Sequence, residues 1–303
     1  MRIGVDVGRT KIEAAVISAD SRLLVSKRIP TPTNGNPETV EAIVCLIEDI
    51  EAQIGVNCSV GIGIPGTLSP ASQRVKNAYN LSFNGYPLDT DLERRLNRPI
   101  RITNDANCFA LSEAIDGAAI GAGTVFGVIL GTGCGSGIVI DGKVLMGANA
   151  IGGEWGHNPL PWMTPDEQPG LSCSCGLAGC IETFLSGTGF ARHHKAVSGI
   201  TLTPREIAAR SASGDALCAE SLSRYENQLA RALASVINLI DPEIIVLGGG
   251  VSNIERLYET VPRLWSHWVF SDRVDTKLVP PTHGDSSGVR GAAWLWPDGF
   301  LPP

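Results

Sequence analysis

Three clustered cysteines and one upstream histidine have the residue types and spacing of a metal site. Cys173, Cys175 and Cys180 lie within eight residues, and His157 lies 16 residues before the first of them. Three thiolates and one imidazole form a four-coordinate donor set for zinc. Four protein ligands leave no open position on the ion, so the pattern predicts a structural zinc that fixes a loop. The alternative is a group of free thiols, with His157 engaged in hydrogen bonding only.

Three glycine-rich segments follow apolar runs and are candidates for phosphate binding. Backbone N–H groups on such a tip form an anion-binding concavity. In the first segment Thr10 adds a hydroxyl, Lys11 adds a positive charge, and Asp6 could hold Mg²⁺ through water. Each run alone is more often a turn, but three at strand ends predict a nucleotide site. The candidate residues are Asp6, Gly8, Arg9, Thr10, Lys11, Gly131, Thr132, Gly133, Cys134, Gly135, Gly248 and Gly249.

A further set of polar side chains could line a crevice for a polyhydroxylated ligand. Asn104 and Asp105 follow a predicted strand and precede a predicted helix, and ligands of α/β proteins bind at such strand ends. The alternative is that Asp105 only caps the helix. Carboxylates and amides bind hydroxyl groups well, which indicates a sugar. The other candidates for this crevice are Glu154, Glu182, Asn77 and Asn80.

These residues are joined by alternating strands and helices, which predict an α/β fold. Residues 3–17 and 126–140 each read as a hairpin with a glycine-rich tip, and the offset of 123 residues favours duplication over a chance match. Residues 116–123 are small and are a candidate domain boundary. We expect strands over 59–64, 100–103 and 244–247, and helices over 38–54, 88–96, 106–115, 216–240 and 286–296, the last capped by Asp285 or Ser286.

Composition narrows the classes of function for this chain of 303 residues. Its 24 Lys and Arg against 31 Asp and Glu give a net charge of −7, which lacks the basic footprint of a nucleic-acid binder. The longest apolar stretch, 236–247, is too short and too polar to span a membrane. The N-terminus has no apolar signal core, so we expect a cytoplasmic protein with reduced cysteines.

Taken together, the motifs resemble those of the ROK family of bacterial sugar kinases, within the hexokinase–actin superfamily. The resemblance covers essentially the whole chain. Residues 156–163 and 283–293 look most like the fructokinase (manno-fructokinase) branch, and N-acetylglucosamine kinases share most of the motifs. The most specific segments are 6–11, 61–66, 104–108, 130–137, 153–157 and 173–182.

The resemblance implies a fold and an activity. It implies a two-domain, ribonuclease H-like α/β fold around a cleft, with residues 1–118 plus 288–303 in one domain and 119–287, with the zinc loop, in the other. It implies a homodimer that uses ATP, Mg²⁺ and a structural Zn²⁺. The expected reaction transfers the ATP γ-phosphoryl group to the 6-hydroxyl of fructose or mannose, with N-acetylglucosamine kinase or glucokinase as the alternative.

The resemblance also implies roles for individual residues. Asp105 would be the general base, and His157 would hold zinc with one ring nitrogen and a sugar hydroxyl with the other. The family usually has Gly where this chain has Arg9, which either contacts phosphate itself or weakens ATP binding; a positive φ there would cost about 1 kcal/mol. Whether Asn77 or Asn80 meets the sugar is open. The residues implied to contact sugar are Asn104, Asp105, Glu154, His157, Glu182, Gly66, Thr67 and Asn80.

Two other classes of protein fit the same resemblance less well. A sugar-responsive transcriptional regulator of this family would carry a helix-turn-helix domain before the first glycine tip, and Asp6 leaves no room for one. A filament-forming or chaperone ATPase of the superfamily would have no reason to place a Cys/His cluster beside Glu154 and Glu182.

Overall fold

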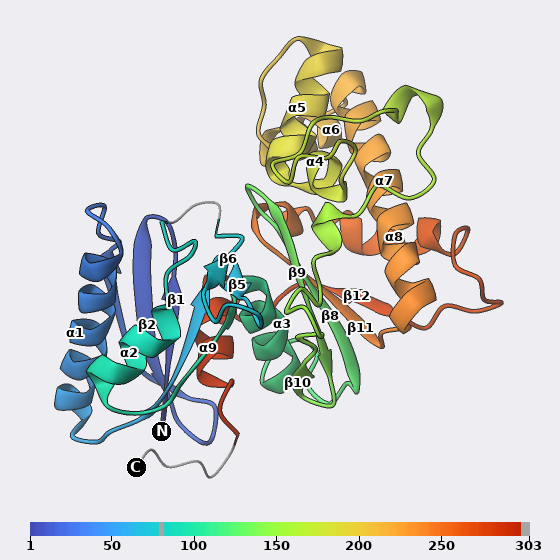
Figure 1. The fold of residues 1–303 in the computed structure, drawn as a ribbon. Coiled ribbons are helices and arrows are strands. Elements are labelled where there is room, and N and C mark those ends of the chain that lie inside the picture. The colour runs from blue at the N-terminus through green and yellow to red at the C-terminus, as the bar shows by residue number, and fades with distance from the viewer. Residues whose placement is uncertain (79–81, 298–303) are drawn as a thin grey trace.

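Two five-stranded sheets, each covered by helices, form the molecule (Figure 1). The computed structural model describes residues 1–78 and 82–297. The α/β class predicted from the sequence is confirmed. No helix in these residues has the length and hydropathy needed to cross a membrane.

One face of the first sheet packs into an apolar core, and the other presents glycine to a closely packed helix. Alternation along β1 puts Ile3, Val5 and Val7 into a core with helices α1 (Asn36–Ile54) and α2 (Leu88–Leu96). A Cβ on Gly4 would lie 1.8 Å from the Val289 carbonyl oxygen, so the C-terminal helix α9 (Ser287–Ala293) rests directly on the opposite face. The strand order is β3 (Leu23–Pro30), β2 (Lys11–Ile17), β1 (Arg2–Val7), β4 (Ser59–Ile64) and β7 (Ile100–Asn104).

The second sheet repeats the topology of the first. In each sheet a three-stranded antiparallel meander is followed by two parallel strands. This equivalence supports the duplication inferred from the two hairpins. The strand order is β10 (Lys143–Val144), β9 (Cys134–Ile140), β8 (Thr124–Leu130), β11 (Ile244–Gly248) and β12 (Lys277–Val279).

Helices α3 (Asp105–Ile115) and α9 (Ser287–Ala293) lie between the two sheets (Figure 1). A Cβ on Gly127 of β8 would lie 2.7 Å from the Ala110 Cβ of α3, and one on Gly291 would overlap the Cys108 carbonyl. Glycine therefore permits this close packing. Helices α7 (Ala216–Ile240) and α8 (Leu257–Trp265) cover the far side of the second sheet. Beyond one end of that sheet, three further helices pack against α7: α4 (Ile181–Leu185), α5 (Gly187–Ser198) and α6 (Pro204–Ala212) (Figure 1).

The C-terminal helix is shorter than the sequence predicts. A 3₁₀ turn (Gly284–Ser286) precedes it, and the Ser286 side chain makes no capping bond. The helix ends at Ala293. Beyond it, the Trp296 indole donates a hydrogen bond to the Val60 carbonyl of β4 at 2.6 Å, which holds the chain against the first sheet. Ser286 does occupy the predicted N-cap position, so the prediction of a helix over 286–296 is wrong in its side-chain capping bond and at its C-terminal end.

Candidate active site

Asp105 stands at the carboxyl edge of the first sheet, where β7 ends and α3 begins. Asn104, rather than Asp105, is the N-cap: its Oδ1 accepts a hydrogen bond from the Ala106 N–H at 2.8 Å. Asp105 is the first helical residue, and its own Oδ1 accepts from the same N–H at 2.8 Å. The capping alternative for Asp105 is therefore wrong, and its second carboxylate oxygen is available for other chemistry.

Three carboxylates, those of Asp105, Asp6 and Glu154, lie near enough at this edge to repel one another electrostatically. Asp105 is partly exposed, yet desolvation by the protein around it, followed by repulsion from Asp6 and Glu154, raises its pKa to about 7. Burial and repulsion from Glu13, its partner across the β1–β2 pair, raise the pKa of Asp6 to about 6. The fold therefore gathers negative charge at one point, where a cation or hydroxyl donors would be stabilised.

The first glycine tip follows β1 next to these carboxylates. The Gly8 N–H donates to the Lys11 carbonyl at 2.9 Å, and the Thr31 hydroxyl donates to the Gly8 carbonyl at 2.7 Å. Arg9 is exposed at the tip, and its φ is not positive. The strain expected for an arginine in place of the family's glycine is therefore absent.

A two-stranded flap, β5 (Thr67–Leu68) and β6 (Val75–Lys76), lies beside Asn104. The Asn104 amide donates to the Gly66 carbonyl at 3.3 Å. Thr67, predicted to contact sugar, is buried. Asn77 has a φ of 60°, and Asn80 lies outside the described residues.

The four predicted zinc ligands converge. The ligand atoms of His157, Cys173, Cys175 and Cys180 all lie within 4.8 Å of one another. The Sγ atoms of Cys175 and Cys180 are 3.6 Å apart, and the Cys173 Sγ is 3.5 Å from the His157 Nδ1. Zn–S bonds of about 2.3 Å in a tetrahedron place two sulfurs about 3.7 Å apart, so the donor set fits zinc. The other ring nitrogen of His157, Nε2, remains for a ligand.

Glu182 joins this cluster to the second glycine tip. Its Oε2 accepts a hydrogen bond from the Cys134 N–H at 3.0 Å, and the Cys173 thiol lies 3.8 Å from its Oε1. A Cβ on Gly133 would lie 2.8 Å from the same carboxylate, so any other residue there would displace it. The structure thus places Glu182 against the tip that follows β8.

A cavity of about 900 Å³ opens beside the second tip. Gly131 and Thr132 line it, together with Gly250. Gly248 and Gly249 do not: a Cβ on Gly248 would collide with Phe109, and Gly249 packs against the backbone at Leu130. Sequence reasoning missed the opposite wall, which α5 and α6 supply. Its polar members, from these helices and the loop between them, are Thr188, Arg192, Lys195, Thr201, Thr203, Arg205 and Glu206.

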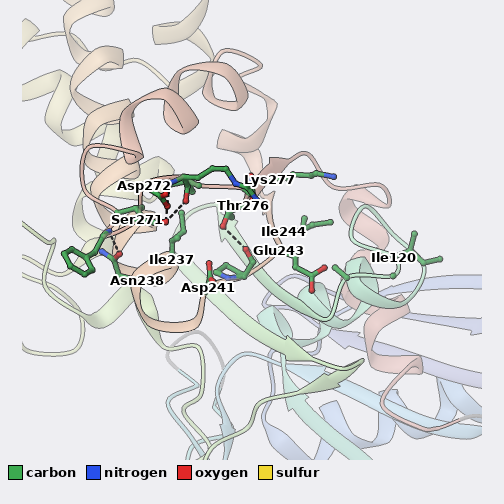
Figure 2. Close-up of a pocket in the computed structure, with 18 residues that line it drawn as sticks. Ile120, Ile237, Asn238, Asp241, Glu243, Ile244, Ser271, Asp272, Thr276 and Lys277 are labelled. Atoms are coloured by element: carbon green, nitrogen blue, oxygen red, sulfur yellow. Dashed lines mark hydrogen bonds and ion pairs between the residues drawn. The ribbon is translucent and has the colours of Figure 1, made fainter.

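A cavity of about 1000 Å³ lies elsewhere, at the amino ends of β11 and β12 (Figure 2). Asp241, Glu243 and Lys277 line it, and the Thr276 hydroxyl donates to the Pro242 carbonyl at 2.8 Å. This edge of the second sheet is opposite to the edge that carries the glycine tip. The cavity contains none of the predicted site residues, so it is not the candidate active site.

Comparison with known proteins identifies the family. A family model described as "ROK family" matches residues 2–299. The chain belongs to the ROK family. An N-acetyl-D-glucosamine kinase of Vibrio cholerae is 40% identical over 299 residues, which cover 97% of this chain and 99% of the relative.

Solved structures of the ROK family share the fold. A ROK hexokinase of Thermus thermophilus has a TM-score of 0.86 at 31% identity, covering 97% of this chain and 96% of that one. A Streptomyces griseus ROK glucokinase, in complex with glucose and AMPPNP, has a TM-score of 0.77 at 28% identity, covering 97% and 98%. The predicted two-domain hexokinase–actin-like fold is confirmed.

The branch assigned from sequence within the ROK family is not supported. The resemblance at 156–163 and 283–293 favoured fructokinases, whereas the Vibrio relative is described as an N-acetyl-D-glucosamine kinase. The comparisons favour the alternative that the sequence left open. Short motifs shared by the whole family do not separate its branches, because the preferred sugar depends on the shape of the pocket.

Proposed function

We propose that this protein is an ATP-dependent kinase that transfers the γ-phosphoryl group to the 6-hydroxyl of N-acetylglucosamine. The observation that carries the proposal is the Asp105 carboxylate, held at the start of α3 beside Asp6 and Glu154. The kinase relative from Vibrio cholerae and the Streptomyces structure with glucose and AMPPNP support the same chemistry.

In the proposed reaction Asp105 accepts the proton of the attacking hydroxyl. A loose phosphoryl-transfer transition state needs positioning more than a strong base. Asn104, Glu154 and the Nε2 of His157 would hold the other hydroxyl groups. The Asp6 carboxylate offers oxygen ligands next to another acidic side chain, Glu13, which suits a hard cation such as Mg²⁺ held through water. That cation would reduce the negative charge of the phosphates.

The nucleotide would lie between the two glycine tips, with its base in the cavity of about 900 Å³. The backbone N–H groups of Thr132 and Gly133 and the Thr132 hydroxyl would bind phosphate oxygens, since the Gly131 N–H already donates to the Gly133 carbonyl at 3.0 Å. We propose that residues 1–118 plus 288–303 and residues 119–287 act as two domains that close on the substrates and exclude water. The homodimer and the cytoplasmic location remain predictions.

The test of this function is a coupled assay of ADP release with MgATP and four sugars: N-acetylglucosamine, glucose, fructose and mannose. We expect the highest kcat/KM with N-acetylglucosamine. A higher kcat/KM with fructose would restore the branch favoured by the sequence. ATP turnover that no sugar stimulates would contradict the kinase proposal.

We predict that kcat/KM for the sugar falls as the pH drops below about 7. The pKa of Asp105 is raised to about 7, so the free protein loses the ionised base below that pH. A pH series from 5 to 9 measures this acid limb. A flat profile down to pH 5 would show that no group with a raised pKa is needed in the ionised form.

We also predict that zinc removal weakens sugar binding. The cluster fixes the loop that carries His157 and Glu182, so Cys180→Ser should raise the sugar KM about tenfold or more and lower the melting temperature. Elemental analysis should find one zinc per wild-type chain and less in the variant. Cys45→Ser, at an exposed cysteine outside the cluster, is the control. A zinc-free preparation with an unchanged sugar KM would contradict the role.

A further inference from the structure

A lysine on the flap joins the two halves of the molecule beside the candidate site. The Lys76 ammonium donates a hydrogen bond to the Asn149 carbonyl at 2.8 Å. Lys76 belongs to β6 and pairs with Thr67 of β5, on the side of the first sheet. Asn149 lies between β10 of the second sheet and Glu154. The bond therefore connects segments that belong to different sheets.

The flap, together with the residues next to it (65–78 and 82–86), is hydrogen-bonded to the start of α3. Gly66 has a φ of 85°, and a Cβ there would lie 2.4 Å from the Lys76 carbonyl oxygen, so only glycine allows this approach. The Val75 N–H donates to the Tyr86 carbonyl at 3.0 Å, and Asn104 donates to the Gly66 carbonyl. Lys76 thus has a fixed position relative to Asn104 and its neighbour Asp105.

The segment on the other side, residues 145–153, is fixed as well. The Gly152 N–H donates to the Met146 carbonyl at 3.0 Å, and the Ser136 hydroxyl of β9 donates to the Gly153 carbonyl. The Thr103 hydroxyl, at the end of β7, lies 3.2 Å from the Met146 sulfur. This segment leads directly into Glu154, so its placement determines where that carboxylate lies.

We infer that Lys76 is a positioning residue, which closes a ring of contacts around the hexose. The ring runs from Asp105 through Asn104 and Gly66 to the flap, across the Lys76–Asn149 bond, and on to Glu154. The inference rests on the proposed function, because the enclosed ligand is the sugar of that reaction. A charge-assisted bond suits this place, since it is stronger than a neutral one and can re-form each time the site closes.

Kinetics with separate sugar and nucleotide titrations test this role. Lys76→Met keeps the aliphatic stem and removes the donor, so the KM for N-acetylglucosamine should rise about tenfold. The KM for MgATP and kcat should change less than threefold, because the bond holds the sugar side only. Lys76→Arg keeps a cationic donor and should recover most of the affinity. Lys143→Met, at an exposed lysine of β10, is the matched control and should behave as the wild type.

Calorimetry with N-acetylglucosamine alone separates this inference from the proposed function. If the wild type binds or phosphorylates the sugar while Lys76→Met keeps its sugar KM and affinity within twofold, the positioning role is overturned and the kinase proposal stands. If the wild type neither binds nor phosphorylates any of the four sugars, both are overturned. Equal loss of MgATP and sugar affinity would also overturn the positioning role. Should Lys76→Met fail to fold, Lys76→Leu, which likewise has no donor, repeats the test, with a wild-type melting temperature showing that the variant is folded.

Discussion

Asp105→Asn is expected to lower kcat about 10³-fold and to leave the KM for the sugar within a few-fold of the wild type. The amide keeps the size of the carboxylate and can still bond to a hydroxyl, but it cannot take the proton as the oxygen attacks. The coupled assay at saturating MgATP measures kcat, and calorimetry with the sugar alone measures binding. Asp20→Asn, at an exposed turn far from the site in sequence, is the control.

The stability of the same variant distinguishes lost chemistry from lost structure. Because the pKa of Asp105 is raised in the folded protein, the wild type binds a proton there that the unfolded chain releases above about pH 4. Asp105→Asn removes this cost, so its melting temperature should exceed that of the ligand-free wild type by a margin that grows up to about pH 7. A variant with near-full kcat would show that another group is the base.

Local sequence patterns predicted most of the fold because its helices and strands are regular. Strand 59–64 and helices 88–96 and 216–240 begin and end where their apolar periodicity does. The two glycine-tipped hairpins were visible as an internal repeat, and the structure gives their sheets one topology. The Cys/His cluster was predictable for a similar reason, since all its members but His157 lie within one short stretch of the chain.

What local patterns could not reveal depends on contacts between distant segments. The wall that α5 and α6 give to the cavity of about 900 Å³ was missed, although the capping box of Thr203 and Glu206 marks the start of α6. The sequence also gave no sign that one Glu182 carboxylate oxygen accepts from Cys134, 48 residues earlier; its predicted contact with sugar stays a prediction. Glu113 gave no signal in the sequence, because its partners come from two other segments of the chain, around Ala118 and over residues 282–287.

Glu113 on α3 is a buried acid that accepts hydrogen bonds from both chain segments that connect the two sheets. It has no exposed surface. Its Oε2 accepts from the N–H groups of Ala118 and Thr282, each at 2.9 Å, and its Oε1 accepts from the His283 N–H at 3.3 Å and the Ser287 hydroxyl at 2.8 Å. Ala118 lies on the chain segment that leaves for the second sheet, and the other three lie on the segment that returns.

Glu113→Ala is therefore expected to destabilise the protein by about 3–5 kcal/mol, because it leaves several buried N–H groups without an acceptor. Glu113→Gln should cost less, about 2 kcal/mol, since one amide oxygen still accepts while the NH₂ group faces other donors. Urea unfolding measures both, with Glu255→Gln as the exposed control. If the free energy of unfolding of Glu113→Ala were within about 0.5 kcal/mol of the wild type, Glu113 would not be what holds the two connecting segments together. The neighbouring Asp116, whose carboxylate accepts from Arg290 and from the Trp294 indole, would then have that role.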